Sequence, residues 1–441
     1  MSAPGNDRLR LEWRPFRFPL PTALVTAHGA LVERRGWLLR LSRDDGAVGW
    51  GEAAPWPQPA DQPLTGRRLA GQRQSSAGEM SPQLQLAAVE IAIAQLGPSL
   101  GRWELEAELP ALAPCLGFAL GLALAELDGL GISGDAEQGR VAGSSDPTGC
   151  RAPWGCPWRA APPSAWLLPA GEAALAALET VLERAEQLQG AEPAEASPGR
   201  PGVAGAMASG AMGDVVLGAA AAVAPDVGGG AADAVALVAA AAPPAAAWRG
   251  APQASGALTF KWKVAAGLDP EERAVLEQLL ARLPHGSRLR LDANGGWDRA
   301  TAQAWAERLA SDPRLEWLEQ PLAPADLEGL TALAALVPVA LDESLRLDPG
   351  LRELWPGWQV RRPSLEGDPR PLLQALTTGT PRLMLSTAFE TGIGRRFLAH
   401  LAALQQDGPT PTAPGLAPGW RPAGALFDND PELVWAAAGG R

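Results

Sequence analysis

The feature that most constrains the fold is a run of four short apolar segments, of which the first carries lysines and the other three each end in an acid. The charged residues are Lys263 in the first segment and Asp292, Glu319 and Asp342 at the ends of the others. They follow one another at intervals of about 23–29 residues, the length of one strand–helix unit. Helix-like patterns that open with an acid or a proline fill the intervals, at 269–282, 298–310 and 324–336. The alternation predicts an α/β fold whose parallel strands bring their carboxyl ends to one face of a barrel.

The first of these segments, 258–264, carries two lysines two residues apart. On a strand, Lys261 and Lys263 therefore point to the same side. Three acids at matching strand ends beside them form a hard, all-oxygen ligand set that suits Mg²⁺ or Mn²⁺. Taken singly, each acid could instead cap a helix or face solvent, and the lysines could be solvated on an edge strand.

The N-terminal part of the chain has a different pattern. Alternating segments at 8–13, 36–41 and 47–52, with a turn at 44–46, predict an antiparallel meander. Helical patterns follow at 81–96 and 116–130. We expect residues 1–150 to form an α+β domain that caps the barrel.

The barrel itself is predicted over 163–408. A strand at 164–168 and a helix at 171–189 open it, and the tail 409–441 could pack back on the first domain. The next strand then comes late, which indicates an insertion at about 190–256, rich in Ala, Gly and Pro. Aspartates, glycines and prolines interrupt its apolar runs, so it lacks the ~20 apolar residues of a transmembrane segment.

The composition of the chain excludes some classes of binding partner and of metal site. A net charge of −12 and a pI near 4.9 argue against nucleic acid or an anionic membrane as the main partner. The first seven residues are too polar for a signal peptide. Three cysteines without zinc-like spacing favour a reducing, cytoplasmic location, and they are Cys115, Cys150 and Cys156. The three histidines also lack metal-ligand spacing and are expected to be structural; they are His28, His285 and His400.

Six short motifs carry a resemblance to a known family. They are 49–55 (Gly-Trp-Gly-Glu-Ala-Ala-Pro), 259–263 (Thr-Phe-Lys-Trp-Lys), 291–297 (Leu-Asp-Ala-Asn-Gly-Gly-Trp), 317–321 (Trp-Leu-Glu-Gln-Pro), 341–344 (Leu-Asp-Glu-Ser) and 385–394 (Leu-Ser-Thr-Ala-Phe-Glu-Thr-Gly-Ile-Gly). With these motifs the chain resembles the o-succinylbenzoate synthases of the enolase superfamily, in the muconate-cycloisomerase-like branch. The resemblance covers most of the chain except the insertion and 131–162. It implies a modified (β/α)7β TIM-type barrel under a capping domain, with Asp292, Glu319 and Asp342 binding Mg²⁺, or Mn²⁺ as a substitute.

The resemblance also implies an activity. It is the Mg²⁺-dependent syn dehydration of a small carboxylate, 2-succinyl-6-hydroxy-2,4-cyclohexadiene-1-carboxylate, to o-succinylbenzoate in menaquinone or phylloquinone biosynthesis. Removing a proton next to a carboxylate gives an enediolate, which bound Mg²⁺ stabilises. Lys263 would be the base. The neighbouring charge of Lys261 would lower the pKa of Lys263 towards the working range.

One position departs from the family pattern, which places a lysine directly before the proline at 363. Arg362 stands there, and an arginine is always protonated, so it cannot be a base. Racemases of the superfamily need a base on each face of the substrate, whereas a syn dehydration needs one acid–base group. Arg362 could still stack as a cation on the ring of the intermediate. The departure favours the synthase, although a weakened or lost activity would leave the same mark.

A glycine turn at 392–394 follows a predicted strand at 382–386 and opens a helix. As a partial dinucleotide motif it is weak, because Phe397 replaces the third glycine. A backbone N–H pocket for an anion fits better, and the resemblance implies that Ser386, Gly392 and Gly394 hold the succinyl carboxylate.

Two other functions stay open on the sequence. One is an N-acylamino-acid racemase, dipeptide epimerase or cycloisomerase of the same superfamily. The other is a non-catalytic barrel that binds a partner through its insertion. The oligomeric state is not fixed by the sequence.

Overall fold

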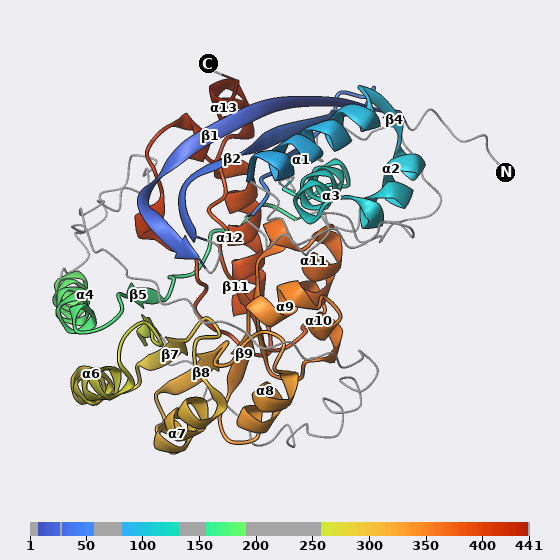
Figure 1. Ribbon diagram of the computed structural model, residues 1–441. Helices are drawn as coiled ribbons and strands as arrows, with labels where there is room; N and C mark the ends of the chain where they lie inside the picture. Colours follow the sequence, from blue (N-terminus) through green and yellow to red (C-terminus); the bar gives the residue numbers. More distant parts are fainter. Residues whose placement is uncertain (1–7, 27–28, 57–81, 132–155, 191–256, 440–441) are drawn as a thin grey trace. The chain divides into compact units, whose positions relative to one another are not determined.

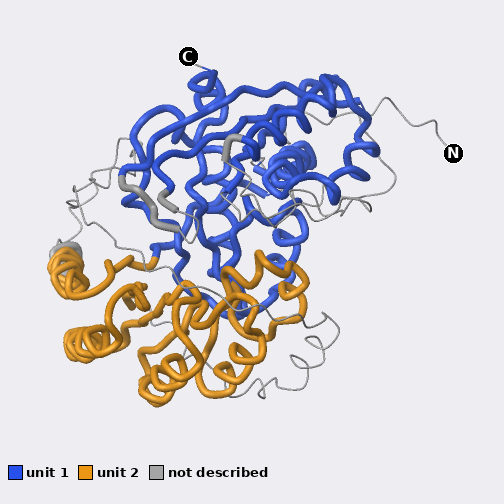
Figure 2. Tube along the Cα trace, in the orientation of Figure 1, with its two compact units in different colours: residues 1–164, 360–441 blue, residues 165–359 orange. Residues whose placement is uncertain are grey.

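The computed structural model describes residues 8–26, 29–56, 82–131, 156–190 and 257–439 (Figure 1). The chain divides into two compact units, one of residues 1–164 with 360–441 and one of residues 165–359 (Figure 2). We call them unit 1 and unit 2. The predicted division into a capping domain at 1–150 and a barrel at 163–408 stays a prediction. Residues 191–256 of the predicted insertion lie outside the described residues.

Unit 1 contains an antiparallel sheet, whose described strands are β1 (Arg8–Thr26), β2 (Gly29–Ser42), β3 (Val48–Ala53) and β4 (Ser99–Gly101). Their order is β3-β2-β1-β4, which confirms the predicted meander. Strand β1 continues well beyond the predicted end at residue 13. Its alternation persists, with Phe16, Phe18 and Leu20 buried, but the prolines at 15, 19 and 21 hid the pattern.

The two helices predicted for this part of unit 1 are present as α1 (Pro82–Leu96) and α3 (Pro114–Leu127). A shorter helix, α2 (Arg102–Glu108), was not predicted. Helix α3 is almost wholly buried, because it packs directly on β3. A Cβ at Gly49 or Gly51 would overlap the backbone carbonyls of α3, so these glycines allow the close approach.

The C-terminal part of unit 1 supplies further elements, which are α11 (Arg370–Thr377), β11 (Leu383–Leu385), α12 (Gly392–Gln406) and α13 (Pro431–Ala437). The strand and helix predicted around the glycine turn are thus confirmed as β11 and α12. Helices α11 and α13 were not predicted.

Unit 2 alternates parallel strands with helices. Its strands are β5 (Trp166–Leu168), β6 (Thr259–Lys263), β7 (Arg288–Asp292), β8 (Leu315–Glu319) and β9 (Val339–Leu341), followed by β10 (Trp358–Arg361) at its end. Its helices are α4 (Ala173–Gly190), α6 (Asp269–Arg282), α7 (Arg299–Leu309), α8 (Leu327–Ala334), α9 (Glu343–Leu347) and α10 (Leu351–Leu354). Among the described strands the order runs β11-β10-β9-β8-β7-β6-β5, a curled parallel sheet. The predicted strand–helix alternation is confirmed, and closure into a (β/α)7β barrel stays a prediction.

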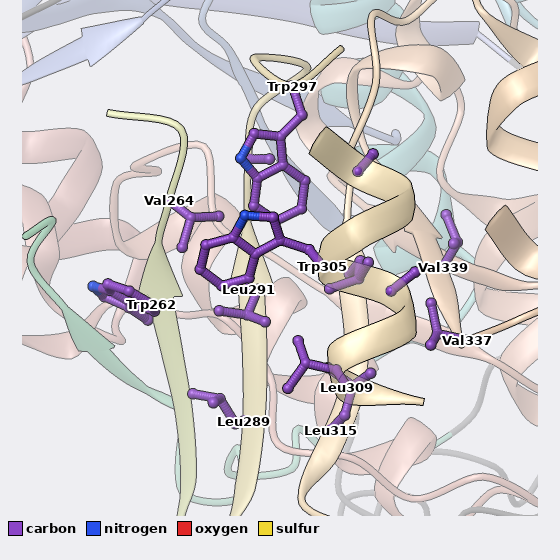
Figure 3. Packing of buried hydrophobic residues seen from close by; sticks show 14 of the residues in the cluster. Trp262, Val264, Leu289, Leu291, Trp297, Trp305, Leu309, Leu315, Val337 and Val339 are labelled. Carbon is purple, nitrogen blue, oxygen red and sulfur yellow. The ribbon is translucent and has the colours of Figure 1, made fainter. Parts of the chain in front are cut away.

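One face of this sheet is apolar. Leu289 and Leu291 of β7 face Trp305 of α7, and Trp262 of β6 lies beside them (Figure 3). The ring of Trp305 stacks on that of Trp297, with centroids 5.0 Å apart. Because side chains alternate along a strand, the residues between these leucines and tryptophans point to the opposite face. That face carries the charged residues of the candidate site.

No helix in the described ranges is long and apolar enough to cross a membrane.

Candidate active site

The register of the parallel strands places charged residues side by side at the carboxyl ends of the strands. Lys263 pairs with Asp292, and Asp292 pairs with Glu319. Glu319 pairs with Ala340 of β9, and Asp342 follows two residues later, at the same parity along the chain. Parallel pairing therefore aligns the strand ends from which the predicted lysine and carboxylates come.

Lys261 joins two of the predicted carboxylates. Its Nζ donates to Glu319 Oε1 at 2.6 Å and lies 2.9 Å from Asp292 Oδ2. Both carboxylates are buried, and the lysine side chain is 15% exposed. Little water screens the attraction between these charges, which offsets part of the desolvation cost of burying them. The two residues lie on different strands, so the bridge fixes the spacing of β7 and β8.

More negative charge lies nearby than Lys261 neutralises. Burial raises the pKa of Glu319; Lys261 opposes this rise, and the charges of Asp292 and Asp342 add to it. Burial and the same two aspartates raise the pKa of Glu343 to about 7. Glu343 was not predicted as a site residue. The site thus contains several carboxylates that repel one another and that an added cation would stabilise.

The donor chemistry fits Mg²⁺, because these side chains offer only carboxylate oxygens. One Glu343 oxygen, Oε2, is buried without a hydrogen-bond partner. Yet no three His, Cys, Asp or Glu side chains of the described ranges stand in an arrangement that could hold a metal ion. The ammonium of Lys261 takes Asp292 and Glu319 instead. The carboxylate oxygens therefore suit Mg²⁺ as ligands, but in the described structure they are not arranged around a common point where the ion could bind.

Lys263 has a partner that was not predicted. Its Nζ donates to Asn294 Oδ1 at 3.3 Å. The backbone N–H of Asn294 donates to Asp292 Oδ1 at 3.1 Å, and its Nδ2 donates to Glu343 Oε1 at 3.2 Å. Asn294 adopts a positive φ of 46°, a conformation that asparagine tolerates better than most residues. The sequence signal was the Asn-Gly-Gly turn just after β7, in a motif to which we had assigned no role beyond Asp292.

Arg290 lies two residues before Asp292 on β7 and forms a separate ion pair. This arginine is completely buried, its Nε donates to Glu316 Oε2 at 2.6 Å, and its guanidinium lies 4.1 Å from the ring of Trp317. The register of β7 and β8 shifts at Leu289/Arg290, which places Glu316 within reach. Hydrophobic periodicity does not tell a buried arginine in a strand from an exposed one. The sequence therefore did not reveal the ion pair of Arg290 and Glu316.

The remaining predicted site residues belong to unit 1. Arg362 follows β10, its backbone N–H donates to Glu366 at 2.6 Å, and its guanidinium donates to the Thr387 carbonyl at 2.6 Å. The Ser386 N–H donates to the Arg361 carbonyl at 2.9 Å, and its hydroxyl lies 3.4 Å from the Gly415 carbonyl. A hydrogen bond thus joins the ends of β10 and β11, the strands that Arg362 and Ser386 directly follow.

The predicted anion pocket at the start of α12 already contains a carboxylate. Glu52 of β3 accepts hydrogen bonds from Thr391 N at 2.9 Å, Thr391 Oγ1 at 2.6 Å and Gly394 N at 3.2 Å. The binding of a substrate carboxylate by Gly392 and Gly394 stays a prediction. In the described structure the N–H of Gly394 donates to Glu52. A Cβ at Gly392 would overlap the Asp428 carbonyl, so that glycine allows two backbones to pack closely.

This buried carboxylate predicts a pH dependence of stability. Burial raises the pKa of Glu52 to about 7, against the hydrogen bonds from Thr391 and the charge of Arg34, while Glu390 adds to the rise. The folded state therefore holds this proton more tightly than the unfolded state. Hence the free energy of unfolding should fall as pH rises from about 4.5 to about 7.

Glu52→Gln removes the titrating group, so we expect the fall of unfolding free energy over that pH range to become shallower. Denaturant titrations at several pH values measure it. The exposed Glu90 provides the control variant, Glu90→Gln, which should keep the wild-type slope. An unchanged slope in Glu52→Gln would show that other groups cause the pH dependence.

The histidines and cysteines do not contribute to the site in the described parts. His400 is buried, with its Nε2 3.7 Å from Cys156 Sγ, and burial lowers its pKa to about 4. His285 is exposed. Cys115 and Cys156 are not in a disulfide. His28 and Cys150 lie outside the described residues.

Comparisons with known proteins agree with this fold. Residues 244–354 match the family model described as enolase C-terminal domain-like. The chain is 29% identical over 405 residues to an o-succinylbenzoate synthase of Thermosynechococcus vestitus, covering 89% of this chain and 88% of that protein. A stretch of 82 residues is 35% identical to a hydrophobic dipeptide epimerase of a Flavobacteria bacterium, covering 18% of this chain and 23% of that protein.

A solved structure extends the similarity over nearly the whole chain. It is the crystal structure of o-succinylbenzoate synthase from Thermosynechococcus elongatus BP-1, complexed with magnesium in the active site. Its TM-score is 0.61 at 27% identity, and the match covers 97% of this chain and 99% of that one. Residues 244–354 therefore match the enolase C-terminal domain-like family, and the chain as a whole is similar to o-succinylbenzoate synthases.

Proposed function

We propose that this protein is an o-succinylbenzoate synthase, a carbon–oxygen lyase that dehydrates 2-succinyl-6-hydroxy-2,4-cyclohexadiene-1-carboxylate in menaquinone or phylloquinone biosynthesis. One observation carries the proposal most directly. Lys261 bridges Asp292 and Glu319 at the strand ends, and Lys263 lies in the same row beside Asn294. The similarity to an o-succinylbenzoate synthase over 89% of the chain supports this choice of reaction.

Asp292, Glu319 and Asp342 would hold Mg²⁺, or Mn²⁺ in its place, in the proposed enzyme. When bound, the ion stabilises the negative charge that develops on the substrate carboxylate. For Lys261, the proposed role is to keep the metal-binding carboxylates in place and to add positive charge beside the substrate. The proposed site lies at the carboxyl ends of the strands, where the active sites of (β/α) barrels are found.

Lys263 would move the proton. Its neutral Nζ takes the proton from the carbon next to the substrate carboxylate, and the electron pair of that C–H bond passes into an enediolate. The C–O bond at the neighbouring hydroxyl then breaks, and the same Nζ returns the proton to the departing hydroxide as water. Both transfers take place on one face of the ring, so a single acid–base group is sufficient.

The other parts of the proposal concern the residues of unit 1, the closure of the barrel and the location of the protein in the cell. Arg362 would stack on the ring of the intermediate as a fixed cation, and Ser386 with the turn at Gly392 and Gly394 would bind the succinyl carboxylate. The parallel sheet would close as a (β/α)7β barrel beneath an N-terminal capping domain. The partner would be this small carboxylate in the cytoplasm.

The experiment that tests the function is a direct assay. The purified protein is incubated with the cyclohexadiene substrate, with Mg²⁺ and with a chelator, and the aromatic product is followed by its absorbance. We expect turnover that depends on the metal. Metal-dependent racemisation without dehydration would support the alternative below, and no turnover with any substrate would leave a binding protein.

The alternative with specific support is an epimerase or racemase, because 82 residues match a dipeptide epimerase at 35% identity. Arg362 argues against it, since an arginine cannot supply the second base. We therefore expect α-proton exchange in deuterium oxide from at most one enantiomer of an N-succinylamino acid. Equal exchange from both enantiomers would mean that another group serves as the second base.

Substitution of Arg362 provides a related prediction. Arg362→Lys should be tolerated, because lysine keeps the cation and can still donate to the Thr387 carbonyl. Arg362→Ala should cost about 1–2 kcal/mol more transition-state stabilisation, measured from kcat/KM. If alanine and lysine variants have the same kcat/KM, the cation at this position contributes nothing to catalysis.

A further inference from the structure

We infer that Gln320 is a positioning residue that holds the segment of Asp342 against the end of β8, where Glu319 lies. The inference rests on the proposed function, because it concerns the same site. Gln320 directly follows Glu319 and is completely buried. Its backbone has a φ of +38°, in the left-handed region that few residues other than glycine adopt. A strained conformation at the edge of a site indicates that the surrounding contacts impose it.

The side chain of Gln320 uses both ends of its amide. Its Oε1 accepts from the backbone N–H of Asp342 at 3.2 Å and of Ser344 at 3.0 Å. Its Nε2 donates to Ser344 Oγ at 2.8 Å and to the Leu322 carbonyl at 3.0 Å. This pattern uses the acceptor and both donors of the amide. No hydrophobic residue, and no acid in its charged form, reproduces it.

These contacts replace a helix cap. Asp342 is the residue before α9, and the first N–H groups of a helix need acceptors outside it. An aspartate in this position commonly supplies one with its own carboxylate. Here Asp342 makes no such bond, and Gln320 accepts from the backbone N–H groups of Asp342 and Ser344 in its place. The Asp342 carboxylate therefore does not cap α9.

Gln320 therefore connects the backbones of two proposed ligands, Glu319 and Asp342. Glu319 and Gln320 are adjacent in the chain, and Gln320 fixes the backbone of Asp342 from 22 residues away. The hydroxyl of Ser344 donates in turn to the Pro324 carbonyl at 2.9 Å, so the loop after β8 joins the same network. Residues of this kind, which orient metal ligands without binding the metal, affect affinity strongly when they are replaced.

The test measures Mg²⁺ binding rather than turnover. Magnesium chloride is titrated into the metal-stripped full-length protein by calorimetry. Gln320→Met removes all four hydrogen bonds at similar volume, and we expect the Mg²⁺ affinity to fall roughly 10–100-fold. Gln320→Asn is the second variant. It tolerates the positive φ and keeps an amide, but its shorter side chain does not reach Asp342, so we expect weaker Mg²⁺ binding in a folded protein even where the methionine variant fails to fold.

A buried glutamine elsewhere in unit 2 provides the control. Gln359 donates to the carbonyls of Arg352 and Trp355, so Gln359→Met should lower thermal stability and leave Mg²⁺ affinity unchanged. Wild-type affinity in Gln320→Asn would overturn this inference alone. An absence of Mg²⁺ binding by the wild type would overturn the proposed function, and this inference with it.

Discussion

Replacing Lys263 with alanine is expected to lower kcat by several orders of magnitude and to leave Mg²⁺ affinity near the wild-type value. The variant loses general-base and general-acid assistance together, each worth about 10²–10⁴-fold. Lys263 contacts Asn294 rather than a predicted ligand in the described geometry, so its removal spares the ion bridge of Lys261. Stopped-flow or steady-state assays of kcat, paired with calorimetric Mg²⁺ titration, measure both quantities.

A second substitution at the same position separates charge from proton transfer. Lys263→Arg keeps a positive charge near Asn294, but arginine does not release its proton in the working pH range. We expect this variant to be as inactive as Lys263→Ala. Activity close to wild type in Lys263→Arg would show that the side chain acts as a cation and that another group moves the proton.

Sequence reasoning was most accurate where a strand ends in an acid before a turn. The predicted segments 288–292 and 315–319 coincide with β7 and β8. Apolar alternation identifies the strand, and the turn residues identify its end. Short elements were missed, because α9 and α10 contain five and four residues and are too short to show a helical period.

Contacts between distant parts of the chain could not be predicted in the same way. Glu52 was recognised only as part of a motif, yet its carboxylate binds Thr391, 339 positions away. Gln320 likewise stood in a recognised motif without a role. Periodicity tells which face a residue occupies, but it does not identify the partner that a buried polar side chain will find. The carboxylates at the strand ends could therefore be placed from the sequence, whereas the polar residues that contact their backbone became visible only in three dimensions.

The three carboxylates are expected to act as one unit on the metal. Alanine in place of Asp292, Glu319 or Asp342 should in each case abolish turnover and lower Mg²⁺ affinity by at least the roughly 10–100-fold that loss of an orienting residue causes. The reason is that the negative charges of these carboxylates repel one another in a buried site. Burial raises the pKa of Glu319, partly through the charges of Asp292 and Asp342, so these groups already interact before any cation is added.

The ion bridge of Lys261 makes the expected result more specific. With Glu319→Ala, the ammonium loses its 2.6 Å contact and keeps its 2.9 Å contact to Asp292, and the site loses a buried acceptor as well as a proposed ligand. Stability must therefore be separated from binding. Glu316→Ala is the matched control, because it removes a carboxylate of the same strand, 12% exposed, that pairs with the buried Arg290 at 2.6 Å. It should destabilise the protein by about 3–5 kcal/mol, as loss of one partner of a buried ion pair does, yet preserve Mg²⁺ affinity in the folded fraction. If an alanine variant at Asp292, Glu319 or Asp342 kept full activity in the presence of chelator, these carboxylates would not be metal ligands. The Lys261 bridge would then be a structural ion pair.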